Sequence, residues 1–104
     1  MALWKSVEQL ENRNNELYFD GCNTIELAEK FGTPLYIYGE NRIRGNYRRL
    51  VNAYQKHYKN FKVFYAVKAN NNPAIVSLLR SEGAGADVSC IPEIKIAQQA
   101  GISN

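Results

Sequence analysis

Blocks of apolar and polar residues in the second half of this chain predict the order strand, helix, strand, helix. The run 63–67 lacks apolar–polar alternation, as is typical of a parallel strand buried on both faces. Stripes with helical spacing follow at 75–79 and 94–100, and a short strand is predicted between them at 86–89. This order predicts α/β architecture with a parallel sheet and right-handed crossovers.

Capping residues mark the ends of these two helices. Asn72 supplies a side-chain acceptor at the N-cap, and Pro73 occupies the first helical position. Gly83 is expected to end this helix, while Pro92 opens the next one and Gly101 ends it.

The clearest helical stripe lies in the middle of the chain. Its apolar members recur with a period of 3.6 residues, which predicts a helix; they are Ile43, Tyr47, Leu50, Val51 and Tyr54. Arginines at 42, 44, 48 and 49 lie mostly off the stripe and indicate a solvated face rather than a nucleic-acid footprint.

Weaker patterns precede this helix. The first 16 residues are polar and rich in asparagine, so we expect an irregular or weakly helical lead-in. A short strand is predicted at 17–19, closed by the turn signal Asp20-Gly21. A short helix should begin after Asn23 and end at Gly32, and the composition of 35–38 favours another strand.

Composition narrows the class of protein. With 104 residues, 45% of them hydrophobic, and a net charge of +3, the chain resembles an ordinary globular protein with a modest core. Cys22 and Cys90 have no metal-ligand spacing and form no disulfide framework, and we interpret His57 as structural or solvated. We therefore expect a cytoplasmic protein with no metal site and no nucleic-acid or membrane partner, because no apolar run suits a signal peptide or a membrane span.

Lys68 is the first candidate for chemistry, because it directly follows the apolar run. A buried ammonium is costly, so a lysine at the tip of a buried strand suggests a neutral amine that forms imines. The alternative is a lysine that simply reaches into solvent, and the strand pattern alone favours that arrangement.

Two carboxylates could share the edge of the sheet that carries Lys68. Asp87 lies in the following strand and Glu93 in the first turn of the helix beyond, and ligands of parallel α/β folds gather at the carboxyl ends of strands. Glu93 could equally well only complement the helix dipole. The glycines at 83 and 85 follow a helix and open a strand, the reverse of a dinucleotide-binding loop, so we interpret them as turn residues.

Four segments together resemble the pyridoxal-phosphate-dependent decarboxylases with an alanine-racemase-like barrel, and within them the diaminopimelate decarboxylase branch. The segments are Phe31-Gly32-Thr33-Pro34-Leu35-Tyr36-Ile37-Tyr38, Arg42-Ile43-Arg44, Phe64-Tyr65-Ala66-Val67-Lys68-Ala69-Asn70-Asn71-Asn72-Pro73 and Gly83-Ala84-Gly85-Ala86-Asp87-Val88-Ser89. The resemblance runs from about Leu17 to Gly101.

The resemblance implies a cofactor, pyridoxal 5′-phosphate, and roles for four residues. Lys68 would be the catalytic residue, joined to the cofactor as an imine, and Ala66, Asp87 and Glu93 would lie near the cofactor. The family usually has glycines before this glutamate, whereas this chain has Cys90-Ile91-Pro92. That departure weakens the assignment of Glu93 more than that of Lys68.

The resemblance also implies a domain layout. We expect a strand-and-helix lead-in at 1–34 and, at 35–104, the first βα units of a (β/α)₈ TIM-type barrel, which needs about 250 residues. The family's C-terminal β-domain and its downstream cofactor and substrate residues would be absent. We therefore expect an N-terminal fragment of a larger enzyme that dimerises with itself, and a chain that is inactive alone.

The substrate implied is meso-diaminopimelate, converted to L-lysine and carbon dioxide in lysine biosynthesis. Three alternatives stay open at this point. The parent could be a related decarboxylase acting on ornithine, arginine or carboxynorspermidine. It could be a non-catalytic carrier of pyridoxal phosphate, or the chain could act only as a structural partner.

Overall fold

The structure, a computed structural model, describes residues 8–103. The chain divides into two compact units, Met1–Arg42 and Ile43–Asn104. None of the helices in the described part has the length and apolar character that spanning a bilayer requires. The domain boundary expected after residue 34 stays a prediction.

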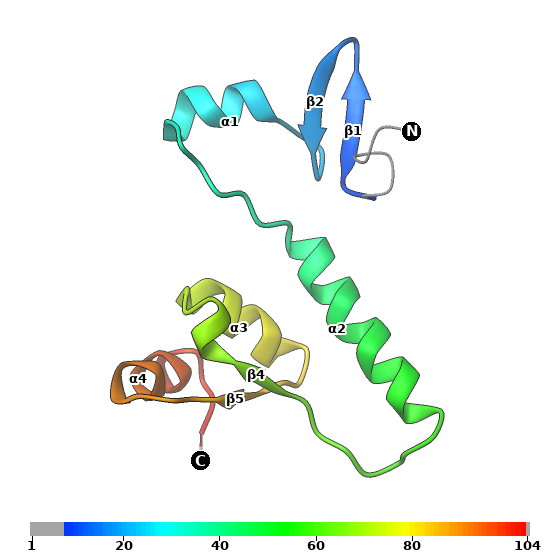
Figure 1. The fold of residues 1–104 in the computed structure, drawn as a ribbon, viewed down its shortest axis with the longest axis vertical. Coiled ribbons are helices and arrows are strands. Elements are labelled where there is room, and N and C mark those ends of the chain that lie inside the picture. Colours follow the sequence, from blue (N-terminus) through cyan, green and yellow to red (C-terminus); the bar gives the residue numbers. More distant parts are fainter. Residues whose placement is uncertain (1–7, 104) are drawn as a thin grey trace. The chain divides into compact units, whose positions relative to one another are not determined.

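The first unit opens with a β-hairpin (Figure 1). Strands β1 (Leu10–Arg13) and β2 (Glu16–Phe19) pair antiparallel. Asn14 and Asn15 form the turn with φ of 52° and 67°, a pair of positive values whose twist suits a two-residue hairpin loop. The expected irregular or weakly helical lead-in is therefore wrong for β1, and its first seven residues lie outside the described part.

A second tight turn adds a third strand. β3 (Cys22–Asn23) pairs antiparallel with β2, and the connecting Asp20 and Gly21 have φ of 49° and 82°. Both the strand predicted at 17–19 and its closing turn are confirmed. Asn and Asp tolerate left-handed backbone better than other side chains, which explains why these turns form.

Helix α1 (Thr24–Phe31) begins and ends as its capping residues predict. The Asn23 side chain accepts hydrogen bonds from the backbone N–H groups of Ile25 and Glu26, at 2.8 and 3.4 Å. At the other end Gly32, with φ of 82°, donates its N–H to the carbonyl of Ala28 at 2.8 Å.

The strand predicted at 35–38 is wrong. Leu35–Tyr38 joins neither of the two sheets among the described residues, and its four apolar side chains are exposed, Tyr36 to 87%. Strand propensity describes how well a side chain fits a half-covered sheet, and it cannot supply the neighbouring strand.

The second unit contains the predicted alternation of strands and helices (Figure 1). It comprises most of α2 (Glu40–Gln55), then β4 (Phe64–Ala66), the 3₁₀ turn η2 (Val67–Ala69), α3 (Pro73–Ser81), β5 (Gly85–Asp87) and α4 (Ile91–Gln99). β4 and β5 are parallel, with Phe64 opposite Gly85 and Ala66 opposite Asp87. These two strands do not close a barrel within the described residues.

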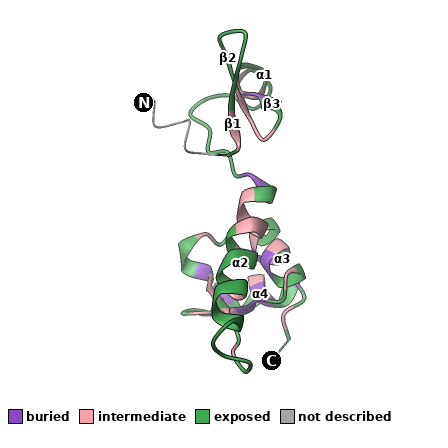
Figure 2. Ribbon diagram, turned by 90° about the vertical axis from the view of Figure 1, so that its right-hand side faces the viewer, coloured by how far each residue is buried: buried purple, intermediate pink, exposed green. Residues whose placement is uncertain are grey.

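A small core holds the second unit together, and Figure 2 colours the buried residues of the described part purple. Val67, Val76 and Ala100 form its buried centre, with five partly buried side chains packed around them: Tyr65, Ala86, Val88, Ile96 and Ile102. The expectation of a strand buried on both faces is wrong, since Phe64 is 57% exposed. A sheet of two strands has too few neighbours to cover both faces.

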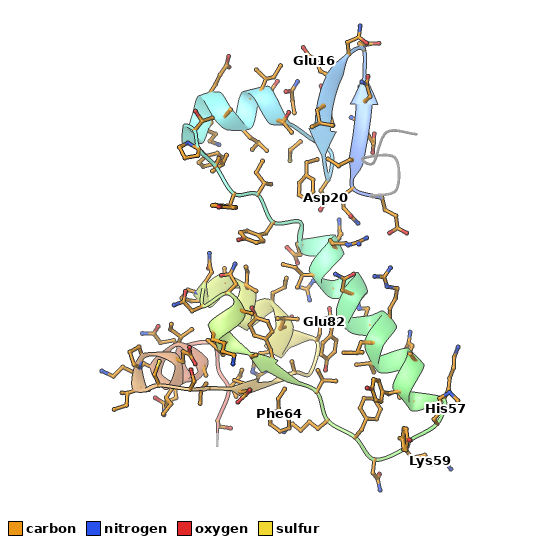
Figure 3. The ribbon with its side chains drawn as sticks, in the orientation of Figure 1. Glu16, Asp20, His57, Lys59, Phe64 and Glu82 are labelled. Atoms are coloured by element: carbon orange, nitrogen blue, oxygen red, sulfur yellow. The ribbon has the colours of Figure 1, made fainter. Side chains whose placement is uncertain are left out.

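Arginines of α2 bind the C-terminal end of α3. Arg44 Nη1 donates to Glu82 Oε1 at 2.6 Å, and Arg48 donates to both carboxylate oxygens at 2.7 Å. The Glu82 side chain, labelled in Figure 3, is only 9% exposed. The solvated arginine face is confirmed at Arg48, whose side chain is 63% exposed although it is ion-paired, and is wrong at Arg44, whose side chain is only 27% exposed.

Candidate functional site

Lys68 lies in η2, one residue beyond the end of β4. Val67 beside it is completely buried and anchors the turn in the core, whereas Lys68 itself is exposed. The position at the carboxyl end of a strand is confirmed, and Lys68 reaches into solvent as the strand pattern alone favoured, so the buried amine suggested for a reactive lysine is wrong. Because Val67 takes the buried position, the next residue of the tight turn projects toward solvent.

Hydrogen bonds brace the loop that carries Lys68. Tyr65 in β4 donates its hydroxyl to the carbonyl of Asn70 at 3.0 Å. The Asn70 side chain accepts the N–H of Asn72 at 3.0 Å, and the Asn72 side chain accepts the N–H of Ala74 at 2.9 Å. The loop is thus held at both ends, by the strand before it and by the cap of α3 after it.

The sheet register places Ala66 and Asp87 side by side. They are paired residues at the carboxyl ends of β4 and β5, and Asp87 is exposed. Since the strands are parallel, the loop with Lys68 and the residue Asp87 both lie at the carboxyl end of this sheet, the edge that carries the candidate site. Three of the four predicted site residues therefore belong to one edge of the sheet.

Glu93 follows the same edge but is differently placed. It is the third residue of α4 and is only 8% exposed. Its Oε2 accepts two hydrogen bonds from Ser89, from the backbone N–H at 2.7 Å and from the hydroxyl at 3.0 Å. Among the described residues, no hydrogen bond or ion pair connects Lys68 to Asp87 or Glu93.

An exposed primary amine beside the carboxyl ends of two parallel strands can condense with an aldehyde. Residues 44–104 match the family model of the pyridoxal-dependent decarboxylases, pyridoxal binding domain. This chain belongs to that family. The carboxyl ends of β4 and β5, where Lys68 lies, fall within the matched segment. Parallel α/β proteins bind their ligands at this end of the sheet.

Curated relatives of the chain are diaminopimelate decarboxylases. The protein from Methanothermobacter thermautotrophicus is 47% identical over 90 residues, which are 86% of this chain and 21% of that protein. The one from Aquifex aeolicus is 45% identical over 93 residues, 89% of this chain and 21% of that protein. The chain thus spans about a fifth of the length of the curated relatives it matches.

Solved structures agree with the fold. The diaminopimelate decarboxylase of M. jannaschii in co-complex with L-lysine superposes with a TM-score of 0.86 at 41% identity, covering 91% of this chain and 23% of that one. AQ1208 from Aquifex aeolicus gives a TM-score of 0.79 at 44% identity, covering 92% of this chain and 23% of that one. The α/β segment described above is therefore a piece of a known architecture.

The residues present fit the family's cofactor, pyridoxal phosphate. The exposed amine of Lys68 is open to the aldehyde of the cofactor, and its loop is fixed by Tyr65 and Asn70. Asp87 adds an exposed carboxylate at the same edge. Glu93 is turned to Ser89 instead, so its carboxylate has a partner within the protein.

Two features of the site were missed by reasoning from sequence. Ser89 lies four residues before Glu93, one residue further than in the usual capping box, so the spacing gave no signal. The brace from Tyr65 to Asn70 depends on a hydroxyl that crosses from strand to loop, and no sequence period reports such a contact.

Proposed function

We propose that this chain is the amino-terminal part of a diaminopimelate decarboxylase, with Lys68 as the residue that binds pyridoxal phosphate covalently. The observation that carries the proposal is the exposed Lys68 amine on a braced loop at the carboxyl end of β4, inside the matched pyridoxal-binding segment. The identities of 45–47% to diaminopimelate decarboxylases support this substrate over other amino acids.

The layout proposed with this function is a lead-in at residues 1–34 followed by the first βα units of a (β/α)₈ barrel at 35–104. In the whole protein the barrel would close, a C-terminal β-domain would be present, and two copies would form a homodimer. The two parallel strands β4 and β5 and their helices support the barrel assignment.

Each site residue would have a defined task. When bound, pyridoxal phosphate supplies an electron sink for the electron pair left behind as carbon dioxide departs from an amino acid. The amine of Lys68 would hold the cofactor. Ala66 would leave room beside the cofactor, because the alanine side chain is small. Asp87 would place a carboxylate at the same edge, where it can accept a proton from the Lys68 amine or return one to it.

Reductive trapping tests the proposal. We would incubate the chain with pyridoxal phosphate, reduce with borohydride and map the labelled peptides, expecting the label to concentrate at Lys68. The K68R variant should lose this labelled peptide, whereas K59R, which changes an exposed loop lysine, should retain it. A label spread evenly over the lysines would contradict the assignment.

We further propose that the 104-residue chain alone does not turn over meso-diaminopimelate. Its two-stranded parallel sheet leaves hydrogen-bonding edges open, and the described residues hold only one side of the site. Carbon dioxide release from meso-diaminopimelate should stay at the level of K68R. Release well above that level would show that these residues suffice for catalysis.

A further inference from the structure

Glu93 has a buried carboxylate whose partner is known. The residue is 8% exposed, and one of its oxygens accepts both the N–H and the hydroxyl of Ser89, at 2.7 and 3.0 Å. Burying a carboxylate is costly unless hydrogen bonds compensate it, and charge-assisted bonds of this length are strong.

A favourable interaction with the helix dipole does not account for this arrangement. A glutamate that only complements the dipole can do so from the surface of the first turn. Glu93 instead reaches back past the N-cap residue, Cys90, which makes no capping hydrogen bond with its own side chain. It therefore binds the residue that precedes the helix and fixes the loop rather than only the helix end.

The loop that Glu93 fixes connects α4 to the site. Ser89 is two residues beyond Asp87, the last residue of β5, and Asp87 is paired with Ala66 at the end of β4. Val88, which lies between Asp87 and Ser89, packs against the core cluster that contains Val67. Lys68 directly follows Val67 in the chain. A loop tethered at Ser89 thus has little freedom at Asp87.

We propose that Glu93 is a positioning residue. Through Ser89 it holds the β5–α4 loop, and thereby keeps the carboxylate of Asp87 at the edge from which Lys68 projects. The inference rests on the proposed function, because it concerns how readily Lys68 captures pyridoxal phosphate. It also reassigns Glu93, which would act through Ser89 and not by touching the cofactor.

Site-specific labelling provides the test. The amine of Lys68 and the aldehyde of pyridoxal phosphate form an imine and release water, and hydride from borohydride then reduces the imine to a stable secondary amine. Peptide mapping gives the amount of label at Lys68 relative to that at Lys59 in the same molecules. Since Lys59 is exposed and lies in the loop before β4, it serves as an internal reference.

Four variants separate positioning from general stability. We expect E93Q and S89A each to lower the Lys68-to-Lys59 label ratio by about fivefold, the factor expected for the loss of one hydrogen bond. S89T keeps a hydroxyl at this position, so its ratio should equal that of the wild type. E82Q is the matched control, because it changes another largely covered, hydrogen-bonded carboxylate whose partners are the arginines of α2. Its ratio should stay at the wild-type value.

Two outcomes would contradict the positioning role. If E82Q lowers the ratio as much as E93Q does, or if both E93Q and S89A leave it unchanged, Glu93 has no positioning role. S89A also keeps the test valid if E93Q does not fold, since it removes only the hydroxyl bond. If wild-type chain carries no preferential label at Lys68, the proposed function itself fails, which is a different result from a preferential label that is insensitive to Glu93.

Discussion

Gly85 shows how much a single residue position matters in this small sheet. It is buried at the start of β5 directly opposite Phe64, and a Cβ added there would meet the Phe64 ring at 2.7 and 2.8 Å. The glycine was interpreted from sequence as a turn residue, which holds for Gly83 with its φ of 106°. At position 85, glycine is required for a different reason, because the Phe64 ring lies so close to the backbone that no side chain fits between them.

We expect G85A to destabilise the second unit by about 1–2 kcal/mol, because the added Cβ overlaps the Phe64 ring and the ring must move. The new methyl group would force the Phe64 ring off the strand. Urea unfolding followed by circular dichroism measures the change.

The matched control is G45A in α2, because a Cβ at Gly45 meets nothing within 4 Å. Replacing a helical glycine there should stabilise the chain by about 0.5–1 kcal/mol. Equal effects of the two substitutions would show that the Phe64 contact does not constrain position 85.

At the level of elements, the sequence predicted the helices well because their signals are local. The cap at Asn72, the proline after it and the glycine at position 83 all act within a few residues, and α3 runs from Pro73 to Ser81 as expected. The strand predicted at 35–38 failed for the opposite reason, because a strand depends on a distant partner. The brace from Tyr65 to the loop of Lys68 likewise depends on a contact that no local sequence pattern reports.

We expect N72A to lower the stability of the second unit by about 1 kcal/mol, the usual cost of losing an N-cap. The Asn72 side chain accepts a hydrogen bond from the N–H of Ala74 at 2.9 Å, and alanine at position 72 leaves that donor without this acceptor. Thermal unfolding at neutral pH measures the loss. N71A changes the preceding exposed asparagine and should have little effect, so a similar loss in both variants would rule out capping as the cause.

At the scale of the whole molecule, sequence reasoning gave the family and the α/β order but not the connections between elements. The lysine loop and its position at the end of a strand followed from local pattern and resemblance. The ion pairs of Glu82 with Arg44 and Arg48 connect residues 34 and 38 apart, and no periodic pattern reports such a distance. For the same reason Glu93 could not be assigned to Ser89 in advance.

The Glu82 connection predicts how acid unfolds the second unit. Hydrogen bonds from Arg48 and Arg44 lower the pKa of Glu82 from its ordinary value of 4.5 to about 2. Above pH 4.5 the carboxylate is charged in both the folded and unfolded chain, and the full stabilisation is present. As the pH falls from 4.5 toward 2, the unfolded chain binds this proton first, so the contribution of Glu82 to stability is progressively lost.

The free energy of unfolding measured by urea titration should therefore decrease more steeply between pH 4.5 and 2 in wild type than in E82Q. The variant should be less stable at pH 7, and the two curves should converge only below pH 2, because Glu82 of the folded chain is still half ionised at its pKa of about 2. Since the Arg48 side chain is 63% exposed and salt screens exposed charges, 0.5 M sodium chloride should narrow the difference at pH 7. Parallel curves across the whole pH range would show that the two arginines do not hold Glu82 ionised in the folded chain.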